Sequence, residues 1–263
     1  MKTEYEIKEI SKDEALDMIK KFHYSNTLPK INKHFVGFFL ESKLVGVITL
    51  GWGTRPLHTI KKIFPSLDTK DYYEIGRMCM TEEMPRNSES QMIAQLVKWL
   101  KQVEPNLKVL FTWADGIIGK AGYVYQSCSF LYGGYATSDM YLKDGVKIHV
   151  RQTRALFKID ENDTRKTIRP TWEQMQKNNI LHIRGRQFKY IKFLCGKTIK
   201  KKLLNECQIE LTNTYPKDKD LYWEIQQEKG KWVEYHKPDY KTDYNKYSKD
   251  SIKELEEINV TEY

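Results

Sequence analysis

The chain has 263 residues, of which 40% are hydrophobic and 13% aromatic, so it can bury a sizeable core in one large domain or in one domain with an appendage. No apolar run approaches the roughly 20 residues that span a bilayer, and the opening residues, MKTEYEIKEI, carry no apolar signal region. The four cysteines form no CxxC pair, which argues against a structural zinc site or a disulfide framework. We therefore expect a cytoplasmic protein with reduced thiols and no membrane partner.

The net charge of +9 is concentrated in one region of the chain. Residues 151–220 contain 17 Lys and Arg against 8 Asp and Glu, whereas the preceding 150 residues contain 20 against 17. A localised basic surface indicates a polyanionic partner, most commonly nucleic acid. The alternative is a solvated, lysine-rich surface with no partner.

The first 52 residues predict a strand, a helix and a β-hairpin, with bounds 3–8, 11–22, 34–41 and 43–52. Ser11 and Glu14 form a capping box at the start of the helix. Pro29 prevents any continuation of that helix. The two hairpin strands are separated only by Glu41 and Ser42.

The next hundred residues predict alternating strands and helices that end in an antiparallel pair, with bounds 72–80, 88–103, 107–113, 119–127, 129–142 and 146–159. Gly76 interrupts the first of these strands. The sequence SESQ at 88–91 reads as a second capping box. Asp144 and Gly145 form the turn of the closing pair.

Together these elements predict an α/β protein of the α+β kind, with a mixed, mostly antiparallel sheet flanked by helices. Their order resembles the GNAT acyltransferase fold and lacks the repeated βαβ units of a doubly wound fold. We expect a GNAT-like catalytic domain over 1–158 and a basic, DNA-binding extension over 159–220. A Tyr-, Lys- and Glu-rich tail, partly mobile, should follow over 221–263, with a short helix at 251–258.

Four stretches carry a more specific resemblance: FHYSNTLPK at 22–30, EIGRMCMTEEMPRNSES at 74–90, ADGIIGKAGYVYQSCSFLYGG at 114–134 and RGRQFKYIKFLCGKTIKKKLL at 184–204. In this order they resemble the Mom family of bacteriophage DNA-modification proteins. The resemblance implies a transferase, acting in the host cell cytoplasm, that adds a carbamoyl-containing group to the N6 amine of adenine in double-stranded DNA. Such a group shields phage DNA from restriction enzymes.

The N6 amine is a poor nucleophile, so catalysis needs a proton acceptor and donors that stabilise an oxyanion. We expect the catalytic residues to be His23, Tyr24, Ser25, Asp115 and Tyr125. Although distant in sequence, they should converge at one edge of the sheet. The simpler alternatives are a helix C-cap for His23 and core packing for Tyr125.

An anionic donor could bind at the start of helix 88–103, and the candidate residues for it are Arg77, Arg86, Asn87 and Ser88. The resemblance does not settle the donor. An acyl donor, acetyl-CoA or a related compound, is the candidate, although this turn lacks the glycines that usually cradle a pyrophosphate. A plain N-cap with a surface arginine is the alternative. The resemblance also implies iron; His23, His34, Cys79 and Asp115 are ligand types whose spacing defines no known site. Gly119 and Gly122 should permit close packing of the backbone.

Because N6 is hydrogen-bonded in duplex DNA, the base must be flipped out or presented single-stranded. Flipping needs an aromatic pocket, for which Tyr24, Trp52 and Trp113 are candidates; the alternative for each is simple core packing. The expected contacts to the DNA backbone are Arg184, Arg186, Lys189, Tyr190, Lys192, Lys200, Lys201 and Lys202. Two other functions remain open. One is N-acetylation of a protein or small amine; the other is DNA binding without catalysis on the same scaffold.

Overall fold

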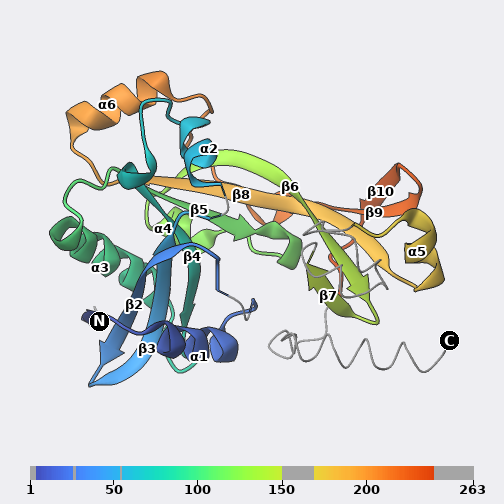
Figure 1. Cartoon of the computed structure of the whole chain (residues 1–263), viewed down its shortest axis with the longest axis horizontal. Helices are drawn as coiled ribbons and strands as arrows, with labels where there is room; N and C mark the ends of the chain where they lie inside the picture. The colour runs from blue at the N-terminus through green and yellow to red at the C-terminus, as the bar shows by residue number, and fades with distance from the viewer. Residues whose placement is uncertain (1–3, 26–27, 54, 150–168, 240–263) are drawn as a thin grey trace, which may run out of the picture. The chain divides into compact units, whose positions relative to one another are not determined.

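The computed structural model describes residues 4–25, 28–53, 55–149 and 169–239. The strands are β1 (Glu6–Glu9), β2 (Asn32–Leu40), β3 (Lys43–Gly51), β4 (Tyr72–Met80), β5 (Val109–Asp115), β6 (Leu131–Lys143), β7 (Val146–His149), β8 (Leu181–Phe193), β9 (Trp223–Glu228) and β10 (Lys231–Tyr235). The helices are α1 (Lys12–Phe22), α2 (Pro56–Lys61), α3 (Ser88–Val103), α4 (Tyr123–Ser127), α5 (Trp172–Lys177) and α6 (Lys197–Glu206). Figure 1 labels most of these elements.

The chain forms two compact units. The first comprises residues up to Ala114 together with 122–135 and 188–215, and the second comprises 115–121, 136–187 and the residues from Pro216 onward. Residues 188–215 of the expected basic extension therefore pack with the N-terminal residues. The division into domains at 158 and 220 remains a proposal.

The strand order confirms the predicted fold class. In the first unit, β1, β2, β3 and β4 are successive antiparallel neighbours, and β4 pairs in parallel with β5. Strand β8 follows β5 in the order, and β6 follows β8. In the second unit, β6 pairs with β7, β8 with β9, and β9 with β10, all antiparallel. This is a mixed, mostly antiparallel sheet with helices, as expected of a GNAT-like protein.

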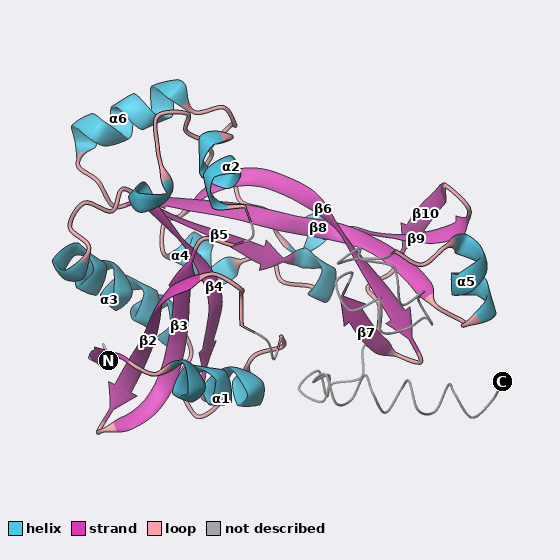
Figure 2. Cartoon of the chain, viewed as in Figure 1, coloured by secondary structure: helices cyan, strands magenta, loops and turns pink. Residues whose placement is uncertain are grey.

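Helices α1 and α3 cover opposite faces of the sheet in the first unit. Ala15 and Ile19 of α1 pack with Val47 and Cys79. The Gly46 position, next to Val47 on β3, lies instead against Met92 of α3. Because alternate residues of a strand point to opposite faces, each helix has its own face. We call these the α1 face and the α3 face; Figure 2 shows both helices against β2, β3 and β4.

The local signals for turns and for the first helix were correct. The side chain of Ser11 accepts from the Glu14 amide, and the Glu14 side chain accepts from the Ser11 amide, so α1 begins with the predicted capping box. Glu41 and Ser42 have positive φ values of 49° and 65°, and Asp144 and Gly145 have 52° and 78°. Such pairs form the two-residue hairpin turns that match the twist of the strands.

Several local expectations were wrong. Helix α3 has no capping box: its N-cap is Asn87, with φ 72° and no side-chain cap, and the Ser88 hydroxyl donates to the Pro85 carbonyl instead. Helix α4 begins only at Tyr123, because Gly122 has φ 90°, which breaks the helix. The β9–β10 hairpin lies within the expected tail. The expected strand beyond residue 149 and the helix at 251–258 fall outside the described residues.

Candidate functional site

The HYS segment, His23-Tyr24-Ser25, leaves the end of α1 on the α1 face. His23 is the C-cap, and its amide donates to the Ile19 carbonyl at 3.0 Å, as the simpler alternative expected. The buried His23 ring stacks on Tyr24 with centroids 4.2 Å apart. The Ser25 amide donates to His23 Nδ1 at 2.9 Å. His23 Nδ1 also lies 3.0 Å from the Ser25 carbonyl oxygen, which can only accept, so the two contacts hold the ring in place without fixing which ring nitrogen carries the proton.

A β-bulge at Gly76 shapes the neighbouring strand. Thr49 pairs with Arg77, and the next residue, Leu50, pairs with Ile75, so Gly76 is the extra residue of β4. The bulge resets the alternation of the strand. As a result, Glu74 and Arg77 both point to the α1 face, where regular pleating would place them on opposite faces.

Arg77 ties the HYS segment to this strand. Its Nη2 donates to the Ser25 hydroxyl at 3.1 Å, and its Nη1 donates to the Gly76 carbonyl at 2.7 Å. A charged side chain inside a strand needs polar partners, and the Ser25 hydroxyl and the Gly76 carbonyl provide two. The guanidinium also carries a positive charge to a face that holds a carboxylate, that of Glu74.

Glu74 is a candidate that the sequence did not indicate. Burial raises the pKa of its carboxyl to about 7, although the Arg77 charge acts in the opposite direction. Gly53, with φ 68°, lies so close that a Cβ there would be 2.5 Å from Glu74 Oε2. A carboxyl that titrates near neutral pH suits a general acid or base.

Strands β4 and β5 part beside these residues. Their parallel pairing runs from Tyr72 opposite Val109 to Ile75 opposite Thr112, and Gly76–Met80 then continue alongside β3. Figure 1 shows β5 turning away from β4. Trp113 lies at this point, edge-on to Phe111 with ring centroids 5.3 Å apart. Since Phe111 pairs with Glu74, both aromatic residues lie on the α1 face.

Tyr125 lies on the other face. It is buried, it hydrogen-bonds the Thr112 side chain, and burial raises the pKa of its hydroxyl. Thr112 alternates with Phe111, so it points to the α3 face. Tyr125 also packs 5.5 Å from the ring of Tyr190. We expected Tyr125 to lie close to His23, but Tyr125 lies on the α3 face and His23 on the α1 face. Core packing, the simpler alternative, describes Tyr125 well.

Asp115 ends β5 and belongs to the second unit. Its Oδ2 lies 3.5 Å from Lys147 Nζ, and both side chains are largely buried, with exposures of 14% and 16%. Asp115 Oδ1 is buried and has no hydrogen-bond partner among the residues that the structure describes. Gly119, with φ 86°, and Gly122 both have positive φ. A Cβ on Gly122 would lie 2.5 Å from Tyr190 Cε2, so the expected close packing is confirmed at Gly122.

The expected donor site at the start of α3 is only partly available. The Ser88 side chain is 1% exposed and its hydroxyl is bound to Pro85. Arg86 is exposed beside it, and Asn87 carries the left-handed N-cap. Arg86, Asn87 and the first amides of α3 remain the groups that an anionic donor could reach.

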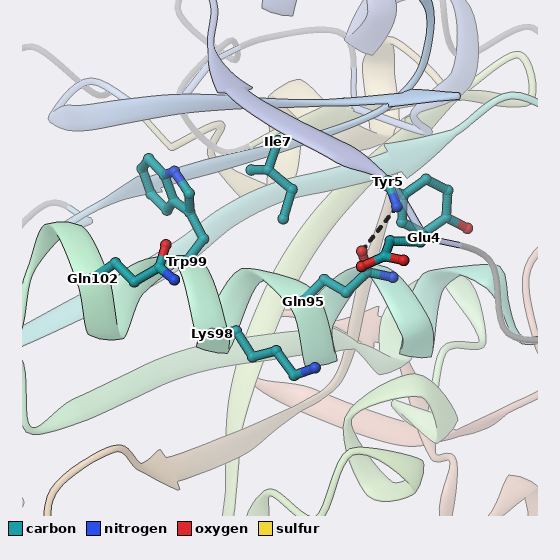
Figure 3. Close-up of a pocket in the computed structure, with 7 residues that line it drawn as sticks. All are labelled: Glu4, Tyr5, Ile7, Gln95, Lys98, Trp99 and Gln102. Atoms are coloured by element: carbon teal, nitrogen blue, oxygen red, sulfur yellow. Dashed lines mark hydrogen bonds between the residues drawn. The ribbon is translucent and has the colours of Figure 1, made fainter. Parts of the chain in front are cut away.

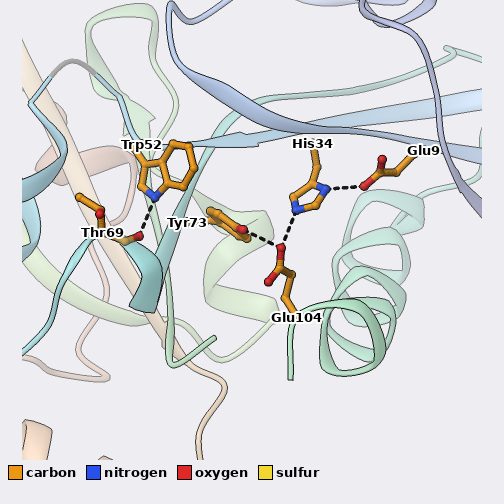
Figure 4. A network of polar contacts seen from close by, with 6 residues as sticks. All are labelled: Glu9, His34, Trp52, Thr69, Tyr73 and Glu104. Carbon is orange, nitrogen blue, oxygen red and sulfur yellow. Dashed lines mark hydrogen bonds and ion pairs between the residues drawn. The ribbon is translucent and has the colours of Figure 1, made fainter. Parts of the chain in front are cut away.

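The residues do not fit an iron site. Within the described ranges, no group of three or more His, Cys, Asp or Glu side chains could hold a metal ion. His34 instead binds Glu9 through Nδ1 and Glu104 through Nε2, and Tyr73 donates to Glu104 at 2.8 Å, as Figure 4 shows. Cys79 is buried, and burial raises the pKa of its thiol to about 12.

A pocket of about 370 Å³ lies between β1 and α3. The residues that line it are Glu4, Tyr5, Ile7, Gln95, Lys98, Trp99 and Gln102, as Figure 3 shows. Gln95 accepts a hydrogen bond from the Tyr5 amide at 2.9 Å. None of the predicted site residues lines this pocket, so it is not the proposed catalytic site.

The candidate DNA contacts in the first unit divide into exposed and packed residues. Lys200, Lys201 and Lys202 are exposed on α6, together with Lys197, which the sequence analysis omitted. Lys192 donates to the Cys128 carbonyl at 2.7 Å, and Lys189 lies 5.5 Å from the Trp113 ring centroid. Tyr190 is fully buried and accepts from Gln126. Its side chain belongs to the core and presents no surface to DNA.

In the second unit, the two candidate arginines are already engaged. Arg184 donates from Nε to Asp139 at 3.1 Å and stacks over Trp232, with Cζ 3.6 Å from the ring centroid. Arg186 donates to the Asp220 carbonyl at 2.9 Å. Both side chains are partly exposed, and their contact with DNA phosphates stays a prediction.

The chain is similar in sequence to a known protein family and to one of its relatives. The model of the Mom protein family matches residues 4–217. The chain is 28% identical to the methylcarbamoylase Mom of Escherichia phage Mu over 203 residues, which is 77% of this chain and 80% of the phage protein. Solved structures give weaker matches. A Bacillus subtilis acetyltransferase in complex with CoA is 14% identical, with a TM-score of 0.38 over 73% of this chain and 98% of its own. A GNAT family N-acetyltransferase from Escherichia coli in complex with CoA is 7% identical, with a TM-score of 0.39 over 82% of this chain and 92% of its own.

Across the described part of the chain, no helix is long and apolar enough to cross a membrane.

Proposed function

The chain belongs to the Mom protein family, and on that premise we propose that it is a DNA-modifying transferase. It adds a carbamoyl-containing, acyl-type group to the N6 amine of adenine in double-stranded DNA. The modified DNA of a phage is thereby protected from restriction in the cytoplasm of the host. The observation that carries this proposal is the match over residues 4–217, which includes all four stretches that resemble the family.

The α1 face supports a role for named residues in the transfer. The N6 nitrogen attacks the carbonyl carbon of the donor, an N–C bond forms, and the bond to the leaving group breaks with its electron pair. The N6 proton passes to Glu74, whose carboxyl pKa of about 7 suits proton transfer at neutral pH. Arg77, fixed by Ser25 and Gly76, supplies positive charge for the developing oxyanion.

The HYS segment supplies donors on the same face. His23 offers an imidazole that can give or take a proton, and Tyr24 offers an aromatic ring, stacked on His23, against which a flipped base can lie. Trp113, on the α1 face where β4 and β5 part, is a second such ring. Trp52 is less suited, because its indole N–H is bound to the Thr69 carbonyl at 2.7 Å. Asp115 remains a proposed contributor, whereas Tyr125, which packs on the α3 face, is given no step in the transfer.

An acyl donor would supply the group that is transferred. Acetyl-CoA itself carries no carbamoyl nitrogen, so in this proposal the donor is a related acyl compound that already contains the carbamoyl group. In this proposal Arg86, Asn87 and the first amides of α3 hold its anionic part. The exposed lysines of α6 bind the phosphate backbone of the DNA, and Arg184 and Arg186 do so from the second unit.

The test is to express the protein in bacteria, digest the DNA to nucleosides and search by mass spectrometry for a new deoxyadenosine species. We expect an adduct with the wild type and at least 100-fold less with Glu74→Gln. Glu6→Gln is the matched control, since Glu6 is exposed on β1 and its carboxylate pairs with Lys8. Unmodified DNA from wild-type cells would contradict the proposal and favour acetylation of another amine or DNA binding alone.

A further inference from the structure

Lys189 of β8 points to the α1 face of the first unit. Two positions further along the strand, Ile191 packs in the same buried cluster as Phe111, which lies on that face. Tyr190, between the two, points to the α3 face, as the alternation of a strand requires. The Lys189 Nζ lies 5.5 Å from the ring centroid of Trp113. Lys189 therefore stands beside one of the rings that we assign to a flipped base.

The charge of Lys189 has no counter-ion. In the described part of the chain, no carboxylate or other acceptor meets its Nζ in a hydrogen bond or an ion pair. Burial lowers the pKa of its amine; the Cys207 thiol acts in the opposite direction, and Lys62, the C-cap of α2, acts in the same one. Burial also raises the pKa of Cys207, so this thiol stays neutral near pH 7. A half-buried cation without a counter-ion is costly, and an anionic ligand removes that cost.

The amine is fixed in place but still open to a ligand. Gly133 of β6 leaves room for the stem of Lys189, since a Cβ there would lie 3.3 Å from Lys189 Cδ. The other end of the side chain is different. Lys189 is partly exposed, and its Nζ, which has no partner in the described ranges, is not sealed from solvent. A packed stem with an open ammonium is a preorganised binding group.

Glu74, Trp113 and Lys189 follow one another across the α1 face, on β4, β5 and β8, which are neighbours in the strand order. Adjacent strands lie about 4.8 Å apart, so the strand of Lys189 is about 10 Å from that of Glu74. In a nucleotide, the base and the sugar separate N6 from the phosphate. An adenine that stacks on Trp113 with N6 toward Glu74 therefore directs its phosphate toward β8.

We propose that Lys189 binds a phosphate of the target nucleotide itself, the one next to the adenine that lies on Trp113. This inference rests on the proposed function, because it assumes that adenine is flipped onto the α1 face. The lysines of α6 hold the backbone of the duplex, whereas Lys189 orients the reacting nucleotide and so distinguishes it from a free amine. A donor that carries a phosphate offers the same chemistry, so binding is tested without donor.

The experiment measures binding of short thymidine strands that contain one adenine. In two further strands the phosphate on the 5′ or on the 3′ side of this adenine is replaced by an uncharged methylphosphonate. The wild type should bind one of these two about 10-fold or more weakly than the unmodified strand, which is the value of one charge-assisted hydrogen bond. Lys189→Met should bind the unmodified strand equally weakly and should not respond to that substitution, since both changes remove one contact.

Lys8→Met is the matched control. Lys8 also lies over an aromatic ring, 5.3 Å from the Phe39 centroid, but on the exposed surface of β1. This variant should respond to the methylphosphonate as the wild type does. If folded Lys189→Met responds to both substitutions as the wild type does, the inference is overturned. Should Lys189→Met not accumulate as folded protein, Lys189→Gln takes its place under the same criterion.

Two further outcomes separate the proposals. If the Lys189 variant binds every strand as the wild type does but modifies DNA more slowly, the phosphate belongs to the donor, and the inference is overturned. If the wild type makes no adduct in cellular DNA, the proposed function fails, and with it the assignment of this adenine as a target. The binding data still decide whether Lys189 meets a phosphate.

Discussion

Glu74 and Arg77 share the α1 face of β4, although three positions separate them along a strand. The extra residue at Gly76 creates this relationship, because Thr49 and Leu50 pair with Arg77 and Ile75 across it. The consequence is electrostatic: a largely buried carboxyl whose pKa is raised to about 7 faces a guanidinium that opposes the shift. A regular strand would have separated the two charges.

We predict that Glu74→Gln changes the pH dependence of both stability and modification. The carboxyl pKa is raised from 4.5 to about 7 in the folded state. The unfolded chain therefore ionises first, and wild-type stability falls as the pH rises from about 4.5 to 7. The thermal midpoint of the purified Gln variant should therefore rise relative to that of the wild type between pH 4.5 and 7. Above pH 7 the difference between the two midpoints should stay constant.

The same titration should appear in the reaction. In clarified lysate, which supplies the donor of the cell, modification of added plasmid by the wild type should rise as the pH passes through about 7, because a base must be unprotonated. The Gln variant should lack this rise. A wild-type profile that is flat between pH 6 and 8 would remove Glu74 from the mechanism.

For α6, we predict that replacing Lys200, Lys201 and Lys202 by alanine weakens duplex binding and flattens its salt dependence. Each lost phosphate contact lowers the slope of log K against log salt concentration by about 0.9. A control triple variant at Lys12, Lys20 and Lys33, which are also exposed, should keep the wild-type slope. Binding of duplex DNA, titrated at several salt concentrations, gives the slope for each protein. An unchanged slope in the α6 variant would mean that these lysines only solvate the helix.

The sequence predicted those parts of the fold that depend on neighbouring residues. The capping box of α1 and the two-residue turns at Glu41-Ser42 and Asp144-Gly145 involve only contacts within a few positions. The placement of β8 next to β5 in the strand order depends on residues far apart in sequence, which local patterns do not record. The β9–β10 hairpin was missed because its strands contain few aliphatic residues.

The candidate site shows the same limit. The HYS segment and Arg77 were found because their residue types suit the chemistry, and Arg77 does meet Ser25. Glu74 was missed because its position depends on a bulge, and only the charged residues on both sides of Gly76 hint at it. Tyr190 was misjudged because an aromatic residue between lysines looks like a surface residue, whereas β8 buries Phe188, Tyr190 and Ile191.

We predict that Gly122→Ala destabilises the protein by about 2–4 kcal/mol, through backbone strain at positive φ and overpacking. The new Cβ would lie 2.5 Å from Tyr190 Cε2 and 2.9 Å from Ala114 Cβ, at a φ of 90°. Gly134→Ala is the matched control: its φ is 81°, but no atom lies within 4 Å of the added Cβ. Denaturant unfolding should therefore show a much smaller loss, about 1 kcal/mol, for the control. Equal losses would mean that the contact with Tyr190 contributes nothing.

The last prediction concerns the acid stability of the second unit, where Asp139 accepts from His182 and from Arg184, each at 3.1 Å. These contacts, that with His182 foremost, lower the pKa of Asp139 from 3.8 to about 2. A depressed carboxyl pKa contributes stability that is present above the unfolded value and is lost as the pH falls through the folded one. A shift of this size corresponds to about 2 kcal/mol. The free energy of unfolding of Asp139→Asn should therefore be lower than that of the wild type by about that amount at pH 7, and this difference should shrink as the pH falls from about 4 to 2.

Chemical unfolding across that pH range measures the difference, with Asp144→Asn at the exposed hairpin turn as the control. A gap that stays constant down to pH 2 would show that the loss at Asp139 is one of packing and not of charge.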